Sequence, residues 1–335
     1  MSLPLISILT PFKNTESFIT ECIDSIRNQT YSNWELVIVD DGSTDRSYDL
    51  VESYQKRDPR IQLLKNSGTG IIDALQLALE QASGTFITRM DSDDIMAPNK
   101  LEVLANNLMS HGKKHVAIGL VRYFCADGVG EGYRHYESWL NDLTKLGTNY
   151  TEIYKECVIP SPCWMIHKDD LMACGAFHPR RYPEDYDLTF RFYKHQFKCI
   201  PCDHVLHYWR DYPTRTSRTH VHYEHNHFTA LKTHHFIAID YNPDKKLVVW
   251  GAGSKGKKTA KILLEHGIAF EWICNNPNKI SRSIYGKVLL PFGHLRSWRN
   301  TQSIITVANK KAQKEIRHYL GTLNLRPVRD YVFFC

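Results

Sequence analysis

Two aspartates separated by a single residue, Asp91 and Asp93, directly follow the apolar stretch 86–90. In a turn at the end of a strand, the first and third carboxylates of such a triplet can face one cavity. A hard divalent cation such as Mg²⁺ or Mn²⁺ prefers oxygen ligands and often takes one or two carboxylates together with substrate phosphates. The triplet therefore indicates a metal site for a phosphorylated ligand. The alternative is a solvated acidic turn, which an isolated D-x-D pattern indicates more often.

Carboxylates also stand beside two other predicted elements. Asp40 and Asp41 follow the apolar stretch 36–39, and Glu184 and Asp185 precede an apolar segment. Taken alone, Asp185 is typical of a helix N-cap, because an aspartate there can accept a hydrogen bond from a free backbone N–H of the first turn.

The elements that must position these residues alternate along the first hundred residues. Apolar runs predict strands at 5–9, 36–39, 61–64 and 86–90. Apolar residues at helical spacing predict a helix after each of the first three strands, the first one capped by Asn14. This alternation indicates parallel βαβ units, whose ligands bind beyond the carboxyl ends of the strands. Asp41 and the D-x-D triplet are thus predicted at the binding edge.

The rest of the chain divides into three further parts. Residues 110–215 are irregular and rich in aromatic side chains, as expected where an acceptor pocket forms. Residues 216–243 contain many histidines and predict a helical connector, and a new βαβ pattern begins at Lys245. We expect an α/β sheet domain at 1–217, a connector at 218–243 and a small Rossmann-like α/β domain at 244–335, with the boundary near residue 240.

Composition limits the class of protein. The chain has 335 residues, of which 42% are hydrophobic and 23% charged, which is typical of globular domains. It contains no apolar run long enough to cross a bilayer and no secretory signal, so we expect a cytoplasmic protein with reduced cysteines. The net charge of +6 suits an anionic substrate or a membrane surface and allows peripheral association with the inner face of the membrane. It is too mild and dispersed to indicate nucleic acid.

Four motifs in sequential order resemble those of the family 2 glycosyltransferases, inverting enzymes with the GT-A fold. The resemblance runs from about Ile6 to Ser217. It is carried by Thr10-Pro11-Phe12-Lys13-Asn14, Val39-Asp40-Asp41-Gly42-Ser43-Thr44-Asp45, Arg89-Met90-Asp91-Ser92-Asp93-Asp94 and Glu184-Asp185-Tyr186-Asp187-Leu188. The resemblance implies a mostly parallel sheet flanked by helices. The whole chain is similar to β-1,3-N-acetylglucosaminyltransferase-like members that carry a comparable C-terminal domain.

The resemblance also implies residue roles for the donor. Thr10 and Asp41 are expected to contact the base of the nucleotide, usually uracil, and Pro11 and Phe12 to shape its pocket. Asp93 is expected to bind the Mn²⁺ or Mg²⁺ directly, while Asp91 supports the ribose or the water shell of the metal.

On the acceptor side, the resemblance makes Asp185 the general base. Glu184, Trp164, Arg210 and Arg215 are candidates for contacts with the diphosphate or the acceptor. Tyr212 stands where relatives often have histidine, which puts in doubt any contact that such a histidine would make. Smaller departures occur at Gln76 and at Gly175-Ala176-Phe177.

Three other patterns suggest ligand sites that we consider less favoured. Cys199-x-x-Cys202, followed by His204 and His207, is spaced too closely for common zinc modules and also fits a core strand. The histidines between 220 and 235 favour a solvated or interface helix over a metal site. Gly251-x-Gly253-x-x-Gly256 follows a predicted strand, but Asn275 and Asn276 replace the acidic residue that holds a dinucleotide ribose. For the C-terminal domain that carries this motif, a structural, oligomerising or regulatory role is favoured over binding of NAD(P).

The expected function is therefore metal-assisted transfer of a sugar from a nucleotide sugar to a hydroxyl of a glycan or lipid-linked acceptor. The expected donors are UDP sugars such as UDP-GlcNAc, UDP-GalNAc, UDP-Gal or UDP-Glc. No nucleic acid partner is expected, and association into a homo-oligomer through the C-terminal domain is left open. The alternative is a catalytically silent protein on the same fold that binds a nucleotide sugar or regulates another enzyme.

Overall fold

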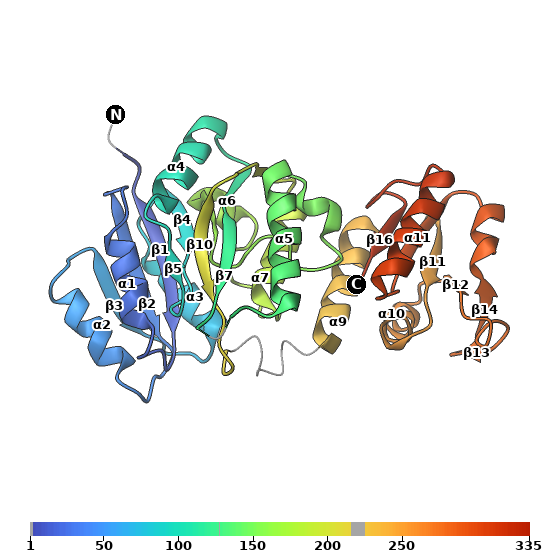
Figure 1. Cartoon of the computed structure of the whole chain (residues 1–335), viewed down its shortest axis with the longest axis horizontal. Coiled ribbons are helices and arrows are strands. Elements are labelled where there is room, and N and C mark those ends of the chain that lie inside the picture. Colours follow the sequence, from blue (N-terminus) through green and yellow to red (C-terminus); the bar gives the residue numbers. More distant parts are fainter. Residues whose placement is uncertain (1–2, 127, 216–224) are drawn as a thin grey trace. The chain divides into compact units, whose positions relative to one another are not determined.

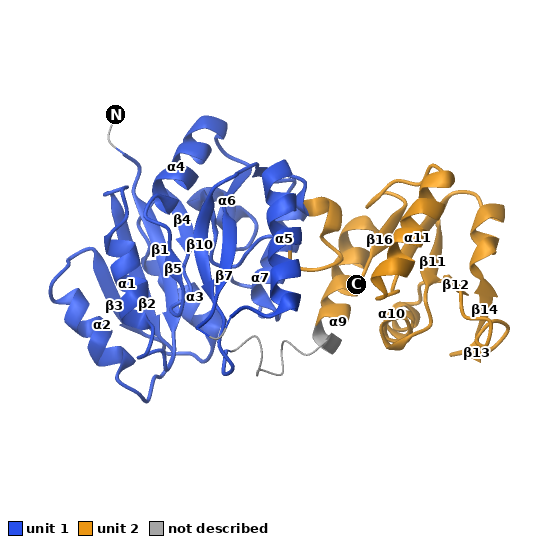
Figure 2. Cartoon of the chain, viewed as in Figure 1, with its two compact units in different colours: residues 1–149, 158–218 blue, residues 150–157, 219–335 orange. Residues whose placement is uncertain are grey.

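The computed structural model describes residues 3–126, 128–215 and 225–335 (Figure 1). The chain forms two compact units, residues 1–149 with 158–218 and residues 150–157 with 219–335 (Figure 2). The main division lies between residues 218 and 219. Two features differ from the expectation: the connector is part of unit 2, and unit 2 also includes residues 150–157 from the middle of the expected sheet domain.

Unit 1 contains a seven-stranded sheet in the order β3-β2-β1-β4-β8-β6-β9. Its strands are β1 (Ile6–Phe12), β2 (Trp34–Asp40), β3 (Ile61–Lys65), β4 (Phe86–Arg89), β6 (His115–Ile118), β8 (Trp164–His167) and β9 (Lys198–Ile200). Strands β1 to β4 are parallel, as predicted, and β8 runs antiparallel to both β4 and β6. A second sheet has the order β5-β10-β7, with β5 (Ile95–Met96), β7 (Leu120–Phe124) and β10 (Val205–Arg210).

Helices flank these sheets (Figure 1). They are α1 (Ile19–Arg27), α2 (Ser47–Gln55), α3 (Ile71–Gln81), α4 (Lys100–His111), α5 (Glu131–Leu146), α6 (Lys168–Ala173) and α7 (Glu184–Lys194). The apolar residues of α1 that the sequence places at helical spacing are buried, and they join a core that includes Ile8 and Ile38 of the sheet. Burial of this apolar face stabilises the helix more than its intrinsic propensity does.

The predicted cap at Asn14 is wrong. Helix α1 begins at Ile19, and its N-cap residue Phe18 makes no capping bond. Asn14 instead has a positive φ of 52° and accepts a hydrogen bond from the backbone N of Thr44 at 2.8 Å. The backbone N of Asn14 donates in turn to Ser43 Oγ at 3.1 Å. Asn14 therefore joins the turns that follow β1 and β2.

Unit 2 has a six-stranded sheet in the order β13-β14-β12-β11-β15-β16, parallel except for β13. Its strands are β11 (Lys246–Trp250), β12 (Glu271–Cys274), β13 (Ser283–Ile284), β14 (Lys287–Pro291), β15 (Thr301–Ile305) and β16 (Tyr331–Phe333). Its helical segments are η1 (Asn149–Glu152), which crosses the boundary, α9 (His225–His235), η3 (Phe236–Asp240), α10 (Ser254–Glu265), η4 (Phe292–Ser297) and α11 (Lys310–Thr322). The strand–turn–helix context of the glycine motif is as expected.

The glycine motif of unit 2 has packing reasons for two of its glycines. Gly251 has a φ of 116°, in a region that side chains disfavour. A Cβ at Gly256 would lie 2.1 Å from the carbonyl O of Gly251, so helix α10 packs against the turn only without a side chain there. Trp250 Nε1 donates to Asn275 Oδ1 at 2.7 Å, which gives Asn275 a structural partner.

No helix in residues 3–126, 128–215 or 225–335 is both long and apolar enough to cross a membrane.

Candidate functional site

The two nucleotide motifs predicted from sequence meet at the carboxyl ends of β1 and β2. Thr10, Pro11 and Phe12 form the last three residues of β1 and are buried. The hydroxyl of Thr10 is buried without a hydrogen-bond partner among the described residues. Such a group is costly unless a ligand or water supplies a partner. The Thr10 hydroxyl can therefore form a hydrogen bond with a ligand.

Asp41 is fixed by neighbours from three different segments. Its Oδ1 accepts hydrogen bonds from Asn66 Nδ2 at 2.7 Å and from the backbone N of Gly70 at 2.8 Å. Lys13 Nζ lies 3.9 Å from its Oδ2. Gly70 has a φ of 90°, which lets its N–H point to the carboxylate. The Asp41 carboxylate is thereby held rigidly beside the end of β1.

Arg89 connects the D-x-D turn to helix α7. As the last residue of β4, it donates from Nε to Asp91 Oδ1 at 3.0 Å and from Nη1 to Glu184 Oε1 at 2.9 Å. Arg89 and Glu184 are buried, at 5% and 4% exposure. A buried pair of this kind is geometrically exacting, and losing either partner strands a charge. Arg89 thus brings Asp91 and the first turn of α7 together, which the sequence analysis did not anticipate.

Asp185 is the second residue of α7 and does not cap it, because the N-cap residue is Pro183. The Asp185 Oδ1 accepts a hydrogen bond from the backbone N of Tyr186 at 2.7 Å. Among the described residues, its Oδ2 has no hydrogen-bond partner. Burial and the adjacent Glu184 carboxylate raise the pKa of Asp185 to about 7, although Arg89 opposes the shift. A carboxylate with this pKa is suited to general base catalysis near neutral pH.

Asp93 accepts a hydrogen bond at Oδ2 from the hydroxyl of Tyr212, at 2.8 Å. Burial and the charges of Asp94 and Asp91 raise the pKa of Asp93 to about 7. Tyr212, the residue that departs from the family pattern, therefore contacts the expected metal ligand directly. Its ring also lies 4.8 Å from the ring of Phe18, centroid to centroid.

Asp94, to which the sequence analysis assigned no role, anchors the D-x-D turn in the core. It is fully buried, and its Oδ2 lies 2.9 Å from His207 Nε2. On the other side of the ring, His207 Nδ1 lies 3.3 Å from Nζ of the fully buried Lys100, which donates to the carbonyl O of Pro162 at 2.5 Å. This chain anchors the turn to β10 and α4. A third adjacent aspartate was the available signal, but its partners are more than a hundred residues away.

The two candidate arginines lie close to the D-x-D turn. Arg210 donates from Nε to the carbonyl O of Asp93 at 2.7 Å and pairs with Glu21. Arg215 is only 8% exposed; burial alone would lower its pKa, but the carboxylates of Asp94 and Asp93 raise it. Positive charge therefore stands close to the acidic turn from two positions.

Trp164 and the zinc alternative have plainer surroundings. Trp164 is 3% exposed and packs edge to face against Phe192. His207, the last histidine of the Cys199-x-x-Cys202 pattern, is committed to the Asp94–Lys100 chain. Of the connector histidines, those at 220 and 222 lie outside the described residues.

The carboxylates of the D-x-D turn can hold a cation only together with oxygen atoms of a bound ligand. Within the described part of the chain, no group of three or more His, Cys, Asp or Glu side chains gathers as a metal site. Asp91 and Asp93 nevertheless supply two carboxylates from one turn, and burial together with the charge of Asp94 raises the pKa of Asp93. A hard cation that also binds two phosphate oxygens needs no more than this from the protein.

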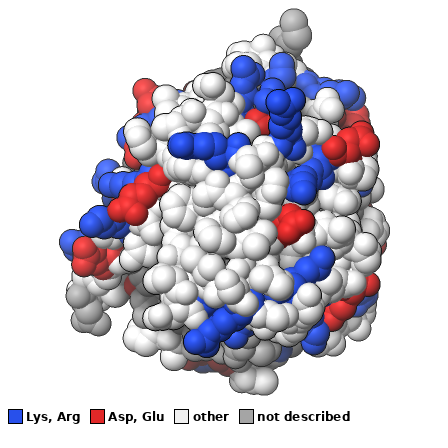
Figure 3. All heavy atoms as spheres, turned by 90° about the vertical axis from the view of Figure 1, so that its right-hand side faces the viewer, with Lys and Arg blue, Asp and Glu red and all other residues white. Residues whose placement is uncertain are grey.

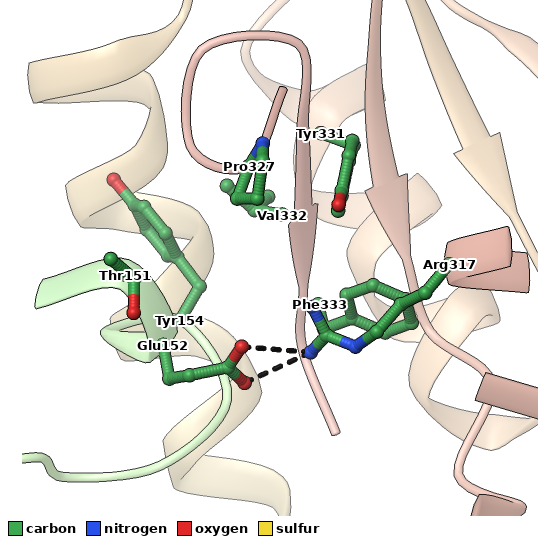
Figure 4. Close-up of a pocket in the computed structure, with 8 residues that line it drawn as sticks. All are labelled: Thr151, Glu152, Tyr154, Arg317, Pro327, Tyr331, Val332 and Phe333. Atoms are coloured by element: carbon green, nitrogen blue, oxygen red, sulfur yellow. Dashed lines mark hydrogen bonds and ion pairs between the residues drawn. The ribbon is translucent and has the colours of Figure 1, made fainter. Parts of the chain in front are cut away.

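A separate pocket lies within unit 2 (Figure 4). Glu152 accepts two hydrogen bonds from Arg317 Nη2, at 2.8 and 3.0 Å, and the Arg317 guanidinium lies 4.1 Å from the centroid of the Phe333 ring. These groups satisfy each other, so the pocket fastens residues 150–157 to α11 and β16. It is lined by Thr151, Glu152, Tyr154, Arg317, Pro327, Tyr331, Val332 and Phe333.

Structural comparison shows the fold of this arrangement. *Staphylococcus aureus* TarS residues 1–349 in complex with UDP-GlcNAc align with a TM-score of 0.56 and 21% identity, over 78% of this chain and 72% of that one. The mannosyltransferase PcManGT from *Pyrobaculum calidifontis*, in complex with GDP-Man and Mn²⁺, aligns with a TM-score of 0.52 and 19% identity, over 70% of this chain and 64% of that one. Unit 1 thus has the expected GT-A fold, and unit 2 adds a further sheet.

Sequence comparison identifies the family. The *Escherichia coli* protein named UDP-Glc:alpha-D-GlcNAc-diphosphoundecaprenol beta-1,3-glucosyltransferase WfgD is 42% identical over 215 residues, which are 62% of this chain and 77% of that protein. The chain spans only 48%, 28% and 42% of the length of three further curated relatives. The model of glycosyl transferase family 2 matches residues 7–175. The chain therefore belongs to glycosyl transferase family 2.

Proposed function

We propose that the chain is an inverting glycosyltransferase that moves a sugar from a UDP sugar to a hydroxyl group of a lipid-linked glycan. The observation that carries this proposal is the pair of bonds from Arg89 to Asp91 and Glu184. They join the turn expected to hold the donor diphosphate to the helix that carries the expected base. A donor site and a base held together by one buried cation are what a single displacement reaction needs.

On the donor side, Thr10 and Asp41 contact the base of the nucleotide, in a pocket shaped by Pro11 and Phe12. A carboxylate that accepts from an amide and a backbone N–H can also accept the imide N–H of uracil. When bound by Asp93, with Asp91 beside it, Mn²⁺ or Mg²⁺ supplies positive charge that stabilises the departing nucleoside diphosphate. Arg215 and Arg210 add cationic charge next to that turn.

On the acceptor side, Asp185 Oδ2 accepts the proton of the attacking hydroxyl group. Attack on the anomeric carbon from the face opposite the diphosphate inverts its configuration and needs no covalent intermediate on the protein. Glu184 positions the first turn of α7, which carries the base, because its Oε1 pairs with Arg89. Trp164 supports the α7 face by packing, because its side chain is almost wholly covered.

The acceptor class follows from the *E. coli* relative, whose name specifies a diphosphoundecaprenol-linked sugar. The neighbours that bind UDP-GlcNAc and GDP-Man support a nucleotide-sugar donor, and the Mn²⁺ in one of them supports the metal.

The test is incubation of the protein with a panel of UDP and GDP sugars, a synthetic lipid diphosphate sugar and Mn²⁺, followed by product analysis. We expect nucleoside diphosphate release that depends on both acceptor and metal, and a product of inverted anomeric configuration. Donor binding without release, with every acceptor, would instead support the silent binding protein. Retention of configuration would refute the role of Asp185 as general base.

A further inference from the structure

Charge is divided unequally along the chain. Residues 1–224 contain 24 Lys and Arg against 30 Asp and Glu, whereas residues 225–335 contain 18 against 6. The modest net charge of the whole chain thus conceals an acidic part and a strongly basic part. A domain with a large excess of one sign attracts partners of the opposite sign over distances of about a Debye length.

Part of the basic excess of unit 2 gathers at the carboxyl edge of its sheet. Strands β11 and β15 are parallel neighbours, and each is followed by a helix, α10 and α11 respectively. The two helices therefore begin at the same edge. Lys255 and Lys257 lie in the first turn of α10, and Lys310 and Lys311 in the first turn of α11. We call these four side chains the basic edge.

The basic edge opposes the electrostatics of its own helices. A helix carries partial positive charge at its N-terminus, so acidic residues stabilise that end and lysines destabilise it. Neither α10 nor α11 has an acidic residue in its first turn. Helix stability therefore does not explain the four lysines, whereas a function that needs positive charge does.

Three acidic residues of unit 2 lie at the opposite edge of the sheet and are paired with lysines. Glu265 ends α10, Glu271 begins β12 and Asp330 precedes β16, all at the amino edge of the sheet. Glu315, in the second turn of α11, and Glu152 and Glu156, in the segment 150–157, are not among these three. The amino-edge acids lie within 4 Å of a lysine, in the pairs Lys261–Glu265 at 3.9 Å, Lys246–Glu271 at 3.9 Å and Lys245–Asp330 at 2.8 Å. Within the described residues, the basic edge makes no ion pair.

We propose that the basic edge of unit 2 binds an anionic phospholipid surface. The proposal rests on the lipid-linked acceptor proposed above, which would reside in a bilayer. Residues 1–224, with their acidic excess, would be repelled by such a surface, so attraction must come from unit 2. On the one face that Figure 3 draws, Lys and Arg cover more of the surface than Asp and Glu do, in keeping with the basic composition of residues 225–335.

The composition of the basic edge favours lipid over nucleic acid. All four residues are lysines, whose ammonium groups act as point charges and suit the diffuse negative potential of a leaflet. Arginine, which recognises bases and phosphates with two parallel hydrogen bonds, is absent from these first turns.

The test is sedimentation of the full-length protein with vesicles of phosphatidylglycerol and phosphatidylcholine, and with vesicles of phosphatidylcholine alone. The variant is Lys257→Glu with Lys311→Glu. The matched control is Arg299→Glu with Arg326→Glu, which makes the same change in net charge at exposed positions of the amino edge. We expect the first variant to lose roughly 20-fold or more in partitioning, because each basic residue near an anionic leaflet contributes about fivefold. The control should lose much less.

Three results would overturn the proposal. One is equal binding of the unaltered protein to both kinds of vesicle, or to neither. Another is an equal loss in the two double variants, which would make net charge alone responsible. The third is edge-dependent binding to an oligonucleotide in preference to anionic vesicles. Because no donor or acceptor is present, the outcome is independent of transfer; a protein that binds vesicles but releases no nucleoside diphosphate would refute only the proposed function.

Discussion

The carboxyl edges of the parallel strands in the two units carry opposite charge. In unit 1, this edge presents Asp41 and the aspartates after β4, whereas in unit 2 it presents Lys255, Lys257, Lys310 and Lys311. Both edges would receive phosphate, but by different means. Carboxylates require a cation between themselves and a diphosphate, whereas lysines attract phosphate directly. The same topological position can therefore support two kinds of phosphate recognition.

The first prediction has the largest expected effect and tests whether the site at the carboxyl edge of unit 1, called the acidic edge below, catalyses transfer. Asp185→Asn keeps the size of the side chain and the bond to Tyr186 but cannot accept a proton. Turnover should fall by about 10²–10⁴-fold, the usual contribution of a positioned base. Binding of UDP with Mn²⁺, measured by calorimetry, should change little. Near-normal transfer by this variant would exclude Asp185 as the base and make Asp187 the next residue to test.

The second prediction tests whether the acidic edge needs a cation. UDP should raise the melting temperature with Mn²⁺ and have little effect with EDTA, because a diphosphate otherwise meets Asp91 and Asp93 as like charges. Asp93→Asn should abolish the metal-dependent part of this shift. An equal shift with EDTA in the unaltered protein would remove the metal from the mechanism. Asp49→Asn, on helix α2, is the matched control and should behave as the unaltered protein does.

The third prediction concerns the buried chain that supports the acidic edge. Lys100→Met removes the ammonium between His207 and Pro162 and leaves polar groups unpaired in the core. We expect the free energy of unfolding to fall by about 3 kcal/mol in urea titrations, as for other broken buried pairs. Lys113→Met, at an exposed ion pair, should have little effect. If both variants lost only a little stability, water or a local rearrangement would be supplying hydrogen bonds to the polar groups that Lys100 leaves behind.

The fourth prediction is a pH dependence. The pKa of Asp185 is raised to about 7, so the base is protonated in most molecules at lower pH. The value of kcat/KM should therefore rise about tenfold per pH unit up to about pH 7 and then level off. For stability the sign is opposite. A carboxyl group with a raised folded-state pKa binds its proton more tightly when folded, so its contribution to stability is lost as pH rises from about 4 to about 7. Asp185→Asn should remove that contribution.

The fifth prediction has the smallest expected effect and concerns the positive charge at the basic edge of unit 2. Asn309 caps α11 by accepting from the backbone N of Ala312 at 2.9 Å. Asn309→Asp keeps the cap and adds a negative charge at the helix N-terminus, so unfolding should cost about 0.5 kcal/mol more. Binding to anionic vesicles should nevertheless weaken by a fewfold. A variant that was more stable and also bound anionic vesicles more tightly would show that the positive charge of the basic edge does not drive vesicle binding.

The sequence by itself determined the parallel order of strands and helices, the carboxyl-edge placement of Asp41 and the D-x-D triplet, and the strand–turn–helix context of the glycine motif. These features depend on hydrophobic periodicity and turn residues, which are local. Periodicity did not determine how far β1 extends or which residue begins α1, because burial against neighbouring strands sets those limits.

Only the tertiary structure decided what surrounds each functional side chain. Arg89 meets Glu184 across 95 positions of the sequence, and Asp94 meets His207 across 113. Neither partner can be read from spacing, since Glu184 lies on helix α7 and His207 on strand β10. The same holds for Tyr212, whose hydroxyl reaches Asp93. The sequence thus shows that a carboxylate is present, but burial and long-range partners set its pKa and therefore whether it can act as a base or bind a cation.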